Sequence, residues 1–572
     1  PGFPTVLHRI AELWKNDRKK LVDSATKTFE KIRDVTSTPS TQGDGLPSAR
    51  RTLLDSSFDQ FASGYDSQHG GFGGAPKFPR PSTLEFLIAE IERHGKRSGK
   101  GQRALMMLTG TLDAMAKGGI NDQLGGGFHR YAVDAIWHVP HFEKMLYDQA
   151  QLVPVYLETY RITGDEKYAE TARNTLDYVL RDMTHQDGGF FSAEDADSPC
   201  PEQPSRQAEG AFYTWSHVEI AELLSEDECR VFSKAMGVEP GGNVDSTSDP
   251  HDEFRGLNIP FSNGEAESES DKRLQSSAIE KLLATRNKRP RPHLDDKVLT
   301  AWNGLMMGAF ARAAVVLGNN RYLEAAQRAA TFLRDQLFDE STGRLRRTWR
   351  NGASAIDAYA DDYAFTISGL IDLYHADFNS DWLQWATELQ ETQIARFHDD
   401  EHGGFFSTSG SDPSVLLRMK EDNDNAEPAV SSVSAINLQR LAALTHRNDW
   451  ADLAERTIAA FSQTLQSSPT ALPMLCVALV RSMDQAPSVI VVSDDEDSPL
   501  IAAAQQASPS GTTIAKVPTD PQKRRFFSST VYESLPTSQS SESALICQQN
   551  TCSPAVNTPE ELSKQLSQFA KH

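Results

Sequence analysis

The stretch from Lys117 to Asp148 holds the residue types that acid/base chemistry on a sugar requires. His129, His138 and His141 follow one another in a glycine-rich segment, and Arg130 stands beside the first of them. Histidine changes its protonation near neutral pH, so it can remove and return a proton next to a carbonyl. The segment therefore predicts the base of a sugar epimerase or isomerase, with Arg130 holding an oxyanion or a sugar hydroxyl.

Carboxyl groups offer a second chemistry. Glycoside hydrolysis needs one protonated and one ionised carboxyl group on either side of the bond. The catalytic candidates are Glu143, Asp148 and Asp362, and Asp296 and Glu427 are expected to contact substrate. The pairing stays open. The same carboxylates stand at predicted helix starts, where Asp and Glu also serve as caps that accept backbone N–H groups.

Aromatic side chains near these groups predict stacking against sugar rings, as in other ligand pockets. Together with Asn303, these candidates for substrate contact are Trp137, Tyr147, Tyr213, Trp215, Trp302 and Tyr363. His138, His141 and Glu143 do not match a recognised metal-ligand spacing, so neither a metal nor another cofactor is expected.

The charge of the chain, 57 − 79 = −22, disfavours binding to nucleic acid and to anionic membrane surfaces. Ala471–Val480, the most apolar stretch near the end, is far too short to span a bilayer. We therefore expect a soluble, intracellular protein, cytoplasmic or mitochondrial. The chain opens with Pro1, so we also expect its natural N-terminus to lie upstream.

The cysteines agree with that location. Five of them are scattered over 572 residues, which fits a reducing compartment better than a secreted disulfide scaffold. Cys547 and Cys552 are too widely spaced for a C-x-x-C redox pair, and we expect a structural role for them.

An internal repeat predicts the elements that position these groups. An aromatic residue stands four positions before an alanine at Tyr168, Tyr322, Trp382 and Trp450, each time after a polar turn. Glycine turns follow three of them, and Gly188–Ser192 and Gly403–Ser407 share the sequence GGFFS. Stacked helical hairpins produce such a period. If the hairpins close into a ring, the polar clusters at the starts of their first helices meet in one cavity.

Two segments break the repeat. An insertion is expected at about 194–295, as a candidate lid over the cavity. After Pro487 the pattern changes to strand, helix and strand, with Ser488–Val492, Ser498–Ala507 and Ala544–Cys547 as the predicted elements. We therefore divide the chain into 1–48, a remnant of an upstream domain with its linker, 49–485, the helical ring, and 486–572, a small α/β unit.

Several long motifs resemble the SPATA20/YyaL-like family. They are GGFGGAPKFPRP at 70–81, GGINDQLGGGFHRYAVDAIWHVPHFEKMLYDQAQL at 118–152, GGFFSAEDADS at 188–198, EGAFYTW at 209–215, DDKVLTAWNGLM at 295–306 and DDYA at 361–364. The resemblance implies a thioredoxin-like domain followed by a six-hairpin, glycosidase-like (α/α)6 toroid. Here Pro1–Trp14 matches just the closing segment of the thioredoxin-like domain, so no thioredoxin-like activity is carried over.

Two functions follow from these patterns. The first is a protein that binds a carbohydrate or sugar-like metabolite and transforms it in the central cavity, as an epimerase, an isomerase or a glycosidase. The second is a non-catalytic scaffold or binding module that works with an upstream thioredoxin-like domain. A fold by itself does not decide between them.

Overall fold

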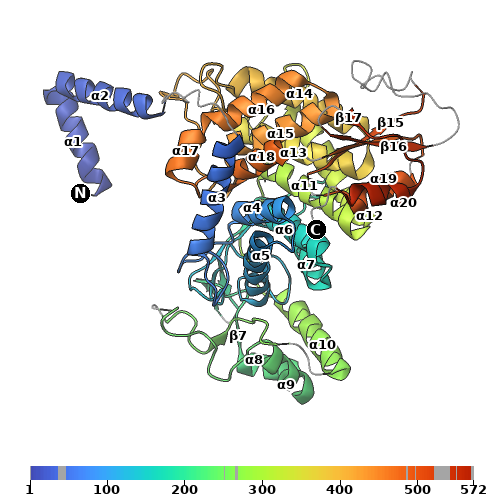
Figure 1. Ribbon diagram of the computed structural model, residues 1–572. Coiled ribbons are helices and arrows are strands. Elements are labelled where there is room, and N and C mark those ends of the chain that lie inside the picture. Colours follow the sequence, from blue (N-terminus) through green and yellow to red (C-terminus); the bar gives the residue numbers. More distant parts are fainter. Residues whose placement is uncertain are drawn as a thin grey trace.

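The computed structural model describes residues 2–36, 47–201, 203–249, 252–264, 268–484, 487–495, 497–509, 511–520, 542–548 and 551–568. In this part of the chain, six helices form a closed inner ring in which each contacts its two neighbours, and the last contacts the first (Figure 1). In ring order they are α4 (Pro81–His94), α6 (Leu146–Thr163), α11 (Thr300–Leu317), α13 (Ala360–Asp377), α15 (Val430–Thr445) and α18 (Pro473–Asp484).

A second layer of helices covers the ring. After each of the first five inner helices the chain returns along an outer one: α5 (Gly99–Lys117), α7 (Glu166–Asp182), α12 (Asn320–Leu337), α14 (Ser380–Phe397) and α16 (Asn448–Ala460). The sixth pair joins distant parts of the sequence, because α18 is covered by α3 (Pro47–Gly64), with the short α17 (Ser462–Ser467) beside it. The predicted (α/α)6 toroid is confirmed.

Residue types explain the two layers. The outer helices bury one face each, and Tyr168, Tyr322 and Trp450 of the repeat lie in it. Inner helices are buried on several sides and approach closely where small residues allow it. A Cβ atom at Gly369 of α13 would lie 2.2 Å from the Gly304 carbonyl oxygen of α11, so glycine is required at this contact.

Because each outer helix returns the chain, all inner helices start at one rim of the ring. Glycine turns and short strands build this rim between the hairpins. The strands are β1 (Tyr131–Ala132), β2 (Pro140–His141), β3 (Lys144–Met145), β4 (Ala193–Glu194), β9 (Leu294–Asp295), β10 (Val298–Leu299), β11 (Phe338–Asp339), β12 (Arg344–Leu345) and β13 (Thr348–Trp349). Strands β3, β4 and β9 form one antiparallel sheet that ties the second hairpin to the third.

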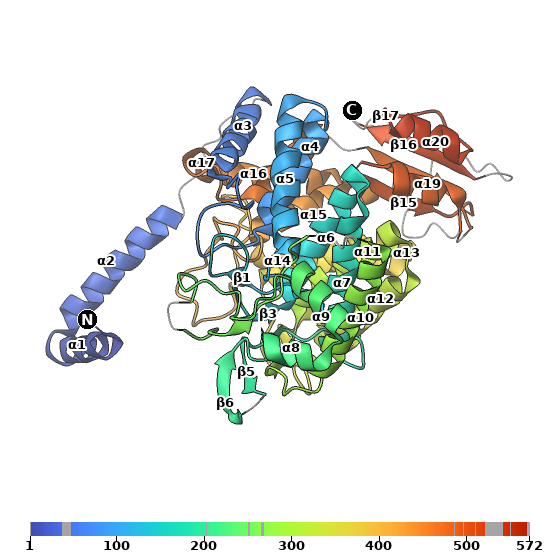
Figure 2. The ribbon, with the colours of Figure 1, turned by 90° about the horizontal axis from the view of Figure 1, so that it is seen from below.

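The insertion extends from the same rim (Figure 2). It contains the hairpin β5 (Asp197–Cys200) and β6 (Gln203–Glu209), the pair β7 (Trp215–Ser216) and β8 (Leu257–Asn258), and three helices, α8 (His217–Leu223), α9 (Glu226–Ala235) and α10 (Glu269–Arg286). Its own apolar core includes Trp215, Ile220, Phe232 and Leu282.

The C-terminal unit is a four-stranded sheet in the order β15-β14-β16-β17, with two helices packed against each other. Its elements are β14 (Ser488–Val492), α19 (Pro499–Ala507), β15 (Thr513–Val517), β16 (Ser543–Gln548), β17 (Thr551–Cys552) and α20 (Pro559–Leu566). β14 and β15 are parallel, and the other pairs are antiparallel. Cys547 and Cys552 occupy paired positions of β16 and β17 and are joined by a disulfide.

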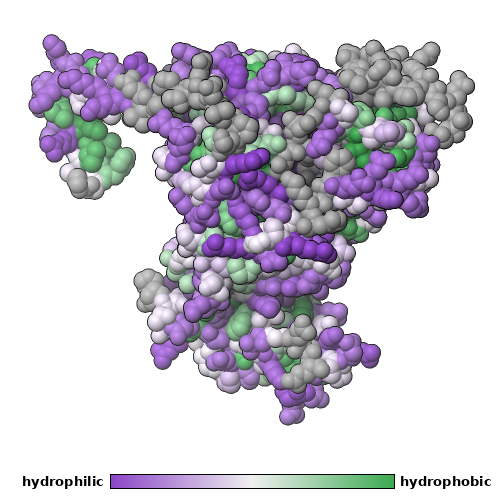
Figure 3. All heavy atoms as spheres, viewed as in Figure 1, coloured by the Kyte–Doolittle hydropathy of each residue, from purple (hydrophilic) through white to green (hydrophobic). Residues whose placement is uncertain are grey.

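Two N-terminal helices, α1 (Phe3–Asn16) and α2 (Arg18–Thr36), project from the toroid (Figures 1 and 2). Apolar side chains of α1 form an exposed face, visible in Figure 3, that includes Phe3, Leu7 and Trp14. Among the helices described here, none is long and apolar enough to cross a membrane.

Candidate functional site

A cavity of about 420 Å³ opens at the rim where the inner helices begin. We call it the rim cavity. Its wall combines the segment before α4 (Phe78–Thr83), the start of α6 (Tyr147 and Asp148), Arg130, the loop 423–426 and residues from 468 to 473 near the start of α18. Gln151 of α6 donates to the Ala426 carbonyl oxygen at 2.8 Å, which holds that loop against the ring.

Asp148 is the most unusual group in this wall. Its side chain is buried, with 4% of the residue exposed, and no described residue hydrogen-bonds its carboxyl group. Burial raises the pKa of Asp148 well above the ordinary value; Arg130 opposes the shift, and Glu427 and Glu143 reinforce it. An unpaired carboxyl group with a raised pKa in a cavity wall is suited to hold and donate a proton.

Arg130, whose charge opposes the pKa shift of Asp148, is itself paired with Glu143. Its Nη1 donates to Glu143 Oε2 at 2.8 Å, and Glu143 lies 3.6 Å from His141 Nε2. Hydrogen bonds that His141 donates to Glu143 and Glu209 raise its pKa to about 9. His141 is therefore a cation at neutral pH and does not act as a base there.

Glu427 follows the loop 423–426 of the cavity wall, and its charge helps to raise the pKa of Asp148. Burial raises the pKa of Glu427 itself to about 7, with Asp361 adding repulsion, while a hydrogen bond from the Trp302 side chain lowers it. The Trp302 ring meets Tyr147 edge to face, with 5.0 Å between the centroids. Two carboxyl groups with raised pKa values thus stand at the starts of α6 and α15, which are not neighbours in the ring, together with two aromatic rings.

An aromatic row borders the rim cavity. Phe78, which is 41% exposed, lies 4.8 Å from the Tyr131 ring between centroids, and Tyr131 stacks on His141 at 5.0 Å. The sequence prediction missed Phe78 and Tyr131. Phe78 could have been found from its proline-rich context, because Pro76, Pro79 and Pro81 exclude a helix and leave its side chain on a loop.

Three other predicted site residues hold the rim together. Asn303 bonds both backbone groups of Phe190, at 2.7 Å to the N–H and 3.0 Å to the carbonyl. The Tyr363 hydroxyl accepts from the Leu345 N–H at 3.1 Å. Asp362 accepts from the backbone N–H groups of Ala301 and Tyr359 and pairs with Arg347 at 2.8 Å, so it caps two elements.

The structure places the remaining predicted residues away from the rim cavity. His129 is buried, with Nδ1 2.9 Å from the Phe142 carbonyl oxygen, and burial together with Lys144 lowers its pKa well below the ordinary value. His138 packs edge to face on Phe261. Asp296 pairs with Arg350 on the outside.

The aromatic residues Trp137, Tyr213 and Trp215 are also buried and turn no ring face toward the rim cavity, because each is enclosed by neighbouring residues. Trp137 donates to the His69 carbonyl oxygen, Tyr213 lies between Phe142 and Lys144, and Trp215 is covered by Arg289. The stacking role predicted for these three rings does not fit this arrangement.

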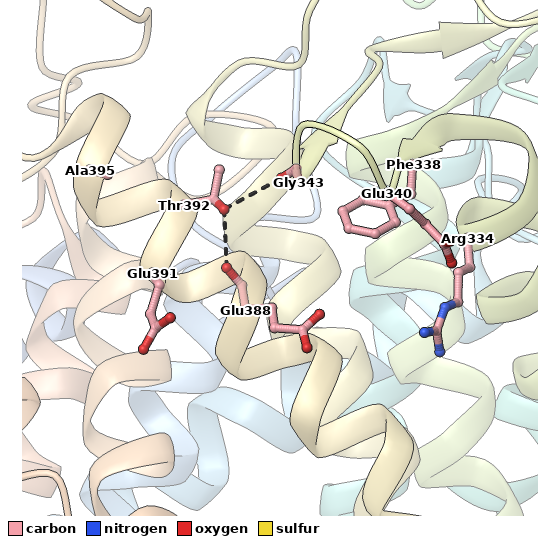
Figure 4. Close-up of a pocket in the computed structure, with 8 residues that line it drawn as sticks. All are labelled: Arg334, Phe338, Glu340, Gly343, Glu388, Glu391, Thr392 and Ala395. Atoms are coloured by element: carbon pink, nitrogen blue, oxygen red, sulfur yellow. Dashed lines mark hydrogen bonds between the residues drawn. The ribbon is translucent and has the colours of Figure 1, made fainter.

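A second hollow, of about 590 Å³, lies between α12 and α14 on the outside of the ring (Figure 4). Glu340, Glu388 and Glu391 border it, and all three are exposed, so water solvates their carboxylates. The rim cavity, with its buried groups, is the better candidate site. Over the described ranges, no cluster of His, Cys, Asp and Glu is arranged to hold a metal ion.

No protein-family model matches the sequence. The human protein "Spermatogenesis-associated protein 20" is 37% identical, over 99% of this chain and 75% of its own length. The mouse protein of that name is 39% identical, over 86% of this chain and 66% of its own length. A Caenorhabditis elegans protein, "Uncharacterized protein B0495.5", is 34% identical over 86% and 69%. A quarter to a third of these proteins lies outside the match.

The chain is also similar to solved structures. A cellobiose 2-epimerase from Spirochaeta thermophila has a TM-score of 0.48 and 13% identity, over 78% of this chain and 99% of that one. A GH76 α-mannanase from Bacteroides thetaiotaomicron has a TM-score of 0.42 and 10% identity, over 76% and 95%.

Proposed function

We propose that this chain, which belongs to the family of spermatogenesis-associated protein 20, binds a sugar or sugar-like metabolite in the rim cavity and cleaves a glycosidic bond by acid/base chemistry. Asp148 carries the proposal. Its carboxyl group is buried and unpaired, and it lines a cavity large enough for a small ligand. A group in this state gives a proton to a leaving oxygen, which is the role of the acid in glycoside hydrolysis.

The second carboxyl group is Glu427. Its pKa of about 7 leaves a large fraction ionised near neutral pH, and a hydrogen bond from Trp302 favours that form, whereas the buried Asp148 carboxyl has no hydrogen bond to favour ionisation. Environments that separate two carboxyl pKa values assign the acid and the base. In the proposed reaction, Asp148 protonates the glycosidic oxygen as its bond to the anomeric carbon breaks. Ionised Glu427 acts on the other face, as a base toward water or as a nucleophile.

The histidines give less support to epimerisation. His141 is protonated between Glu143 and Glu209, and His129 is enclosed behind the rim. A base that abstracts a carbon-bound proton must reach the substrate unprotonated. Carboxyl chemistry therefore fits the rim cavity better.

Substrate contacts come from the rest of the wall. Phe78 offers an exposed ring face, and Arg130, Asn423 and Asn425 offer hydrogen-bond donors. An aromatic platform with a few convergent polar groups is a usual composition for a small-molecule pocket. The substrate class we propose is an uncharged or weakly charged sugar.

A thermal-shift screen against free sugars, amino sugars and short oligosaccharides tests the binding step. A ligand at 100 times its Kd stabilises the folded state by about 2.7 kcal/mol. We expect a hit whose affinity falls in Arg130→Met and is unchanged in Arg321→Met, on the outer face of α12. If no sugar in the screen shifts the Tm, the scaffold function is favoured.

A further inference from the structure

A second space runs along the axis of the ring, from Pro81 and Ser82 at the rim toward the opposite end. This axial space, of about 120 Å³, is lined by all six inner helices. It continues into a chamber of about 150 Å³ beneath the C-terminal unit, since the two share Pro154, Arg312, Asp372, Arg440 and Arg481. We call this chamber the basal chamber.

Specific contacts fix the C-terminal unit over this chamber. Gln505 donates to the His375 carbonyl oxygen at 2.8 Å, and the Ile514 N–H donates to His375 Nε2 at 3.3 Å. Arg161 donates to the Ser508 carbonyl oxygen at 2.7 Å. The C-terminal unit and the ring therefore form one chamber, which stays open to solvent where the Arg312 side chain is 41% exposed.

Three guanidinium groups, from Arg312, Arg440 and Arg481, line the basal chamber but share a single hydrogen-bonded carboxylate. Asp372 accepts from Arg312 Nε at 2.8 Å and from Arg440 Nη2. The Nη groups of Arg312, and Nε and Nη1 of Arg440, have no hydrogen-bond partner among the residues that the structure describes. Guanidinium donors are thus available inside the chamber.

Of the three arginines, Arg481 has the fewest partners. Within the described part of the chain its guanidinium makes neither an ion pair nor a hydrogen bond, and it lies against Gly511, where a Cβ atom would be 3.1 Å from Cζ. Burial lowers the pKa of Arg481 to about 10, and repulsion from Arg440 contributes. Arg481 is half-buried, and the charges of Glu92 and Glu85 attract it without an ion pair to either among the described residues.

The charges of the chamber do not cancel. Arg161 is paired with Glu158, and burial, followed by Arg440, lowers the pKa of His375 to about 3, so it is neutral. The three other arginines and Asp372 sum to 3 − 1 = +2. Glu85 of the axial space has a pKa raised by burial, and its ionisation would still leave +1.

Two hydroxyl groups add further free donors. Ser508 Oγ and Thr512 Oγ1 line the chamber, are buried and lack a hydrogen-bond partner. Ser508 is 7% exposed. Buried polar groups in proteins are normally paired, so unpaired hydroxyls beside surplus guanidinium groups indicate a missing acceptor.

We propose that the basal chamber binds a phosphate group, either inorganic phosphate or a small phosphate monoester, through Arg312, Arg440, Arg481 and the two hydroxyls. A phosphate dianion matches the charge of +2, and guanidinium forks suit its oxygens. Arg312 lies nine residues along α11 from Asn303 at the rim, roughly 14 Å at 1.5 Å per residue. The arginines are therefore remote from Asp148, although the axial space adjoins the rim cavity at Pro81 and Ser82, and the site does not depend on the proposed sugar chemistry.

A different role for these arginines makes the opposite prediction. The carbonyl ends of the inner helices point toward this side, and arginines near helix C-termini stabilise them. If that were their sole role, removal of Arg481 would destabilise the protein, and phosphate would have no specific effect.

Thermal unfolding and calorimetric titration with sodium phosphate, at ionic strength matched by sodium chloride, separate the two roles. We expect phosphate to raise the Tm of the wild type, and Kd to rise at least tenfold in Arg481→Met. Without phosphate, this variant should unfold no lower than the wild type, because a repelled cation is removed. Arg321→Met is the surface control and should keep the wild-type response.

Ser508→Ala provides a second variant, since its loss breaks no bond within the protein. It should weaken phosphate binding without lowering the Tm of the free protein. Phenyl phosphate distinguishes the two possible ligands. If phenyl phosphate binds and inorganic phosphate does not, the site is specific for phosphate monoesters. If neither phosphate nor phenyl phosphate shifts the wild type, or if Arg481→Met responds equally, the proposal is wrong.

Discussion

His141 Nδ1, on β2, lies 2.7 Å from Glu209 Oε1, at the end of β6. This ion pair joins the rim to the insertion, and Glu143 holds the same imidazolium from the other side, 3.6 Å from Nε2. The insertion is thus fastened beside the rim cavity by one titratable group.

This ion pair should make stability depend on pH. The folded-state pKa of His141 is raised to about 9, so its contribution is fully present below the unfolded pKa of about 6.5 and is lost as pH rises through 9. We expect His141→Gln to lower the free energy of unfolding by about 1 to 2 kcal/mol at pH 6, after allowance for solvent screening. Urea unfolding of both proteins from pH 5.5 to 10 measures the difference, and a constant difference would contradict the assignment.

Substitution of Asp148 should stabilise the protein, whereas substitution of His141 should destabilise it. The folded-state pKa of Asp148 is raised by burial, so its contribution is present below the unfolded pKa near 3.9 and declines as pH rises toward the folded-state pKa. Asp148→Asn should gain stability relative to the wild type by about 1.4 kcal/mol per pH unit across that window.

Thermal denaturation between pH 4 and 9 checks this expectation. Asp381→Asn, at the exposed start of α14, is the matched control and should show no such trend. If the Asp148→Asn variant instead loses stability relative to the wild type as pH rises, the carboxylate is ionised and paired in the folded protein.

The two hydrogen bonds between the Asn303 side chain and the Phe190 backbone, which we call a clamp, should contribute strongly to stability. Asn303→Ala leaves a buried N–H and a buried carbonyl group without partners, and we expect it to lower the free energy of unfolding by about 2 to 4 kcal/mol. Chemical denaturation measures this cost. Gln384→Ala, on the exposed face of α14, should cost less than 0.5 kcal/mol by the rough scale for surface substitutions; equal costs would show that the clamp is unimportant.

Phe78 should matter for binding rather than for folding. Its ring is 41% exposed, so Phe78→Ala should barely change Tm but weaken a sugar bound in the rim cavity roughly tenfold, about 1.4 kcal/mol. Titration of the best ligand from the screen tests this. Unchanged affinity would remove the aromatic row from the site.

The repeat predicted most of the ring because each hairpin must bury the same apolar face. The last pair escaped prediction, since α3 and α18 lie at opposite ends of the sequence and no local pattern links them. Contacts such as Arg50 Nη2 to Glu455 Oε2, at 2.6 Å, appear only after folding. In the C-terminal unit, the strand Thr513–Val517 was missed although Ser488–Val492, of the same length, was predicted, because TIAKV contains Ala and Lys where SVIVV is almost entirely β-branched.

The sequence predicted that the site lies at the rim where the inner helices start, but it did not predict the role of each residue there. Tyr147, Asp148, Arg130 and Glu427 gather because helix starts meet at one end of a toroid. Asn303 shares their position in the repeat but binds backbone, as Gln149 does with Phe128 and Ser431 with Phe405. The signal for these clamps was a Gly-Gly-Phe turn before each of the three helices, at 126–128, 188–190 and 403–405.

The most direct test of the central claim is product formation from the sugar that binds best, followed for the wild type, Asp148→Asn and Asp381→Asn. We expect Asp148→Asn to keep its affinity within a few-fold and to lose about 10²- to 10⁴-fold in kcat, the usual contribution of a positioned acid, while Asp381→Asn matches the wild type. Turnover by Asp148→Asn at the wild-type rate, or no product from the wild type, would contradict the assignment of Asp148 as the acid of a glycoside-cleaving site.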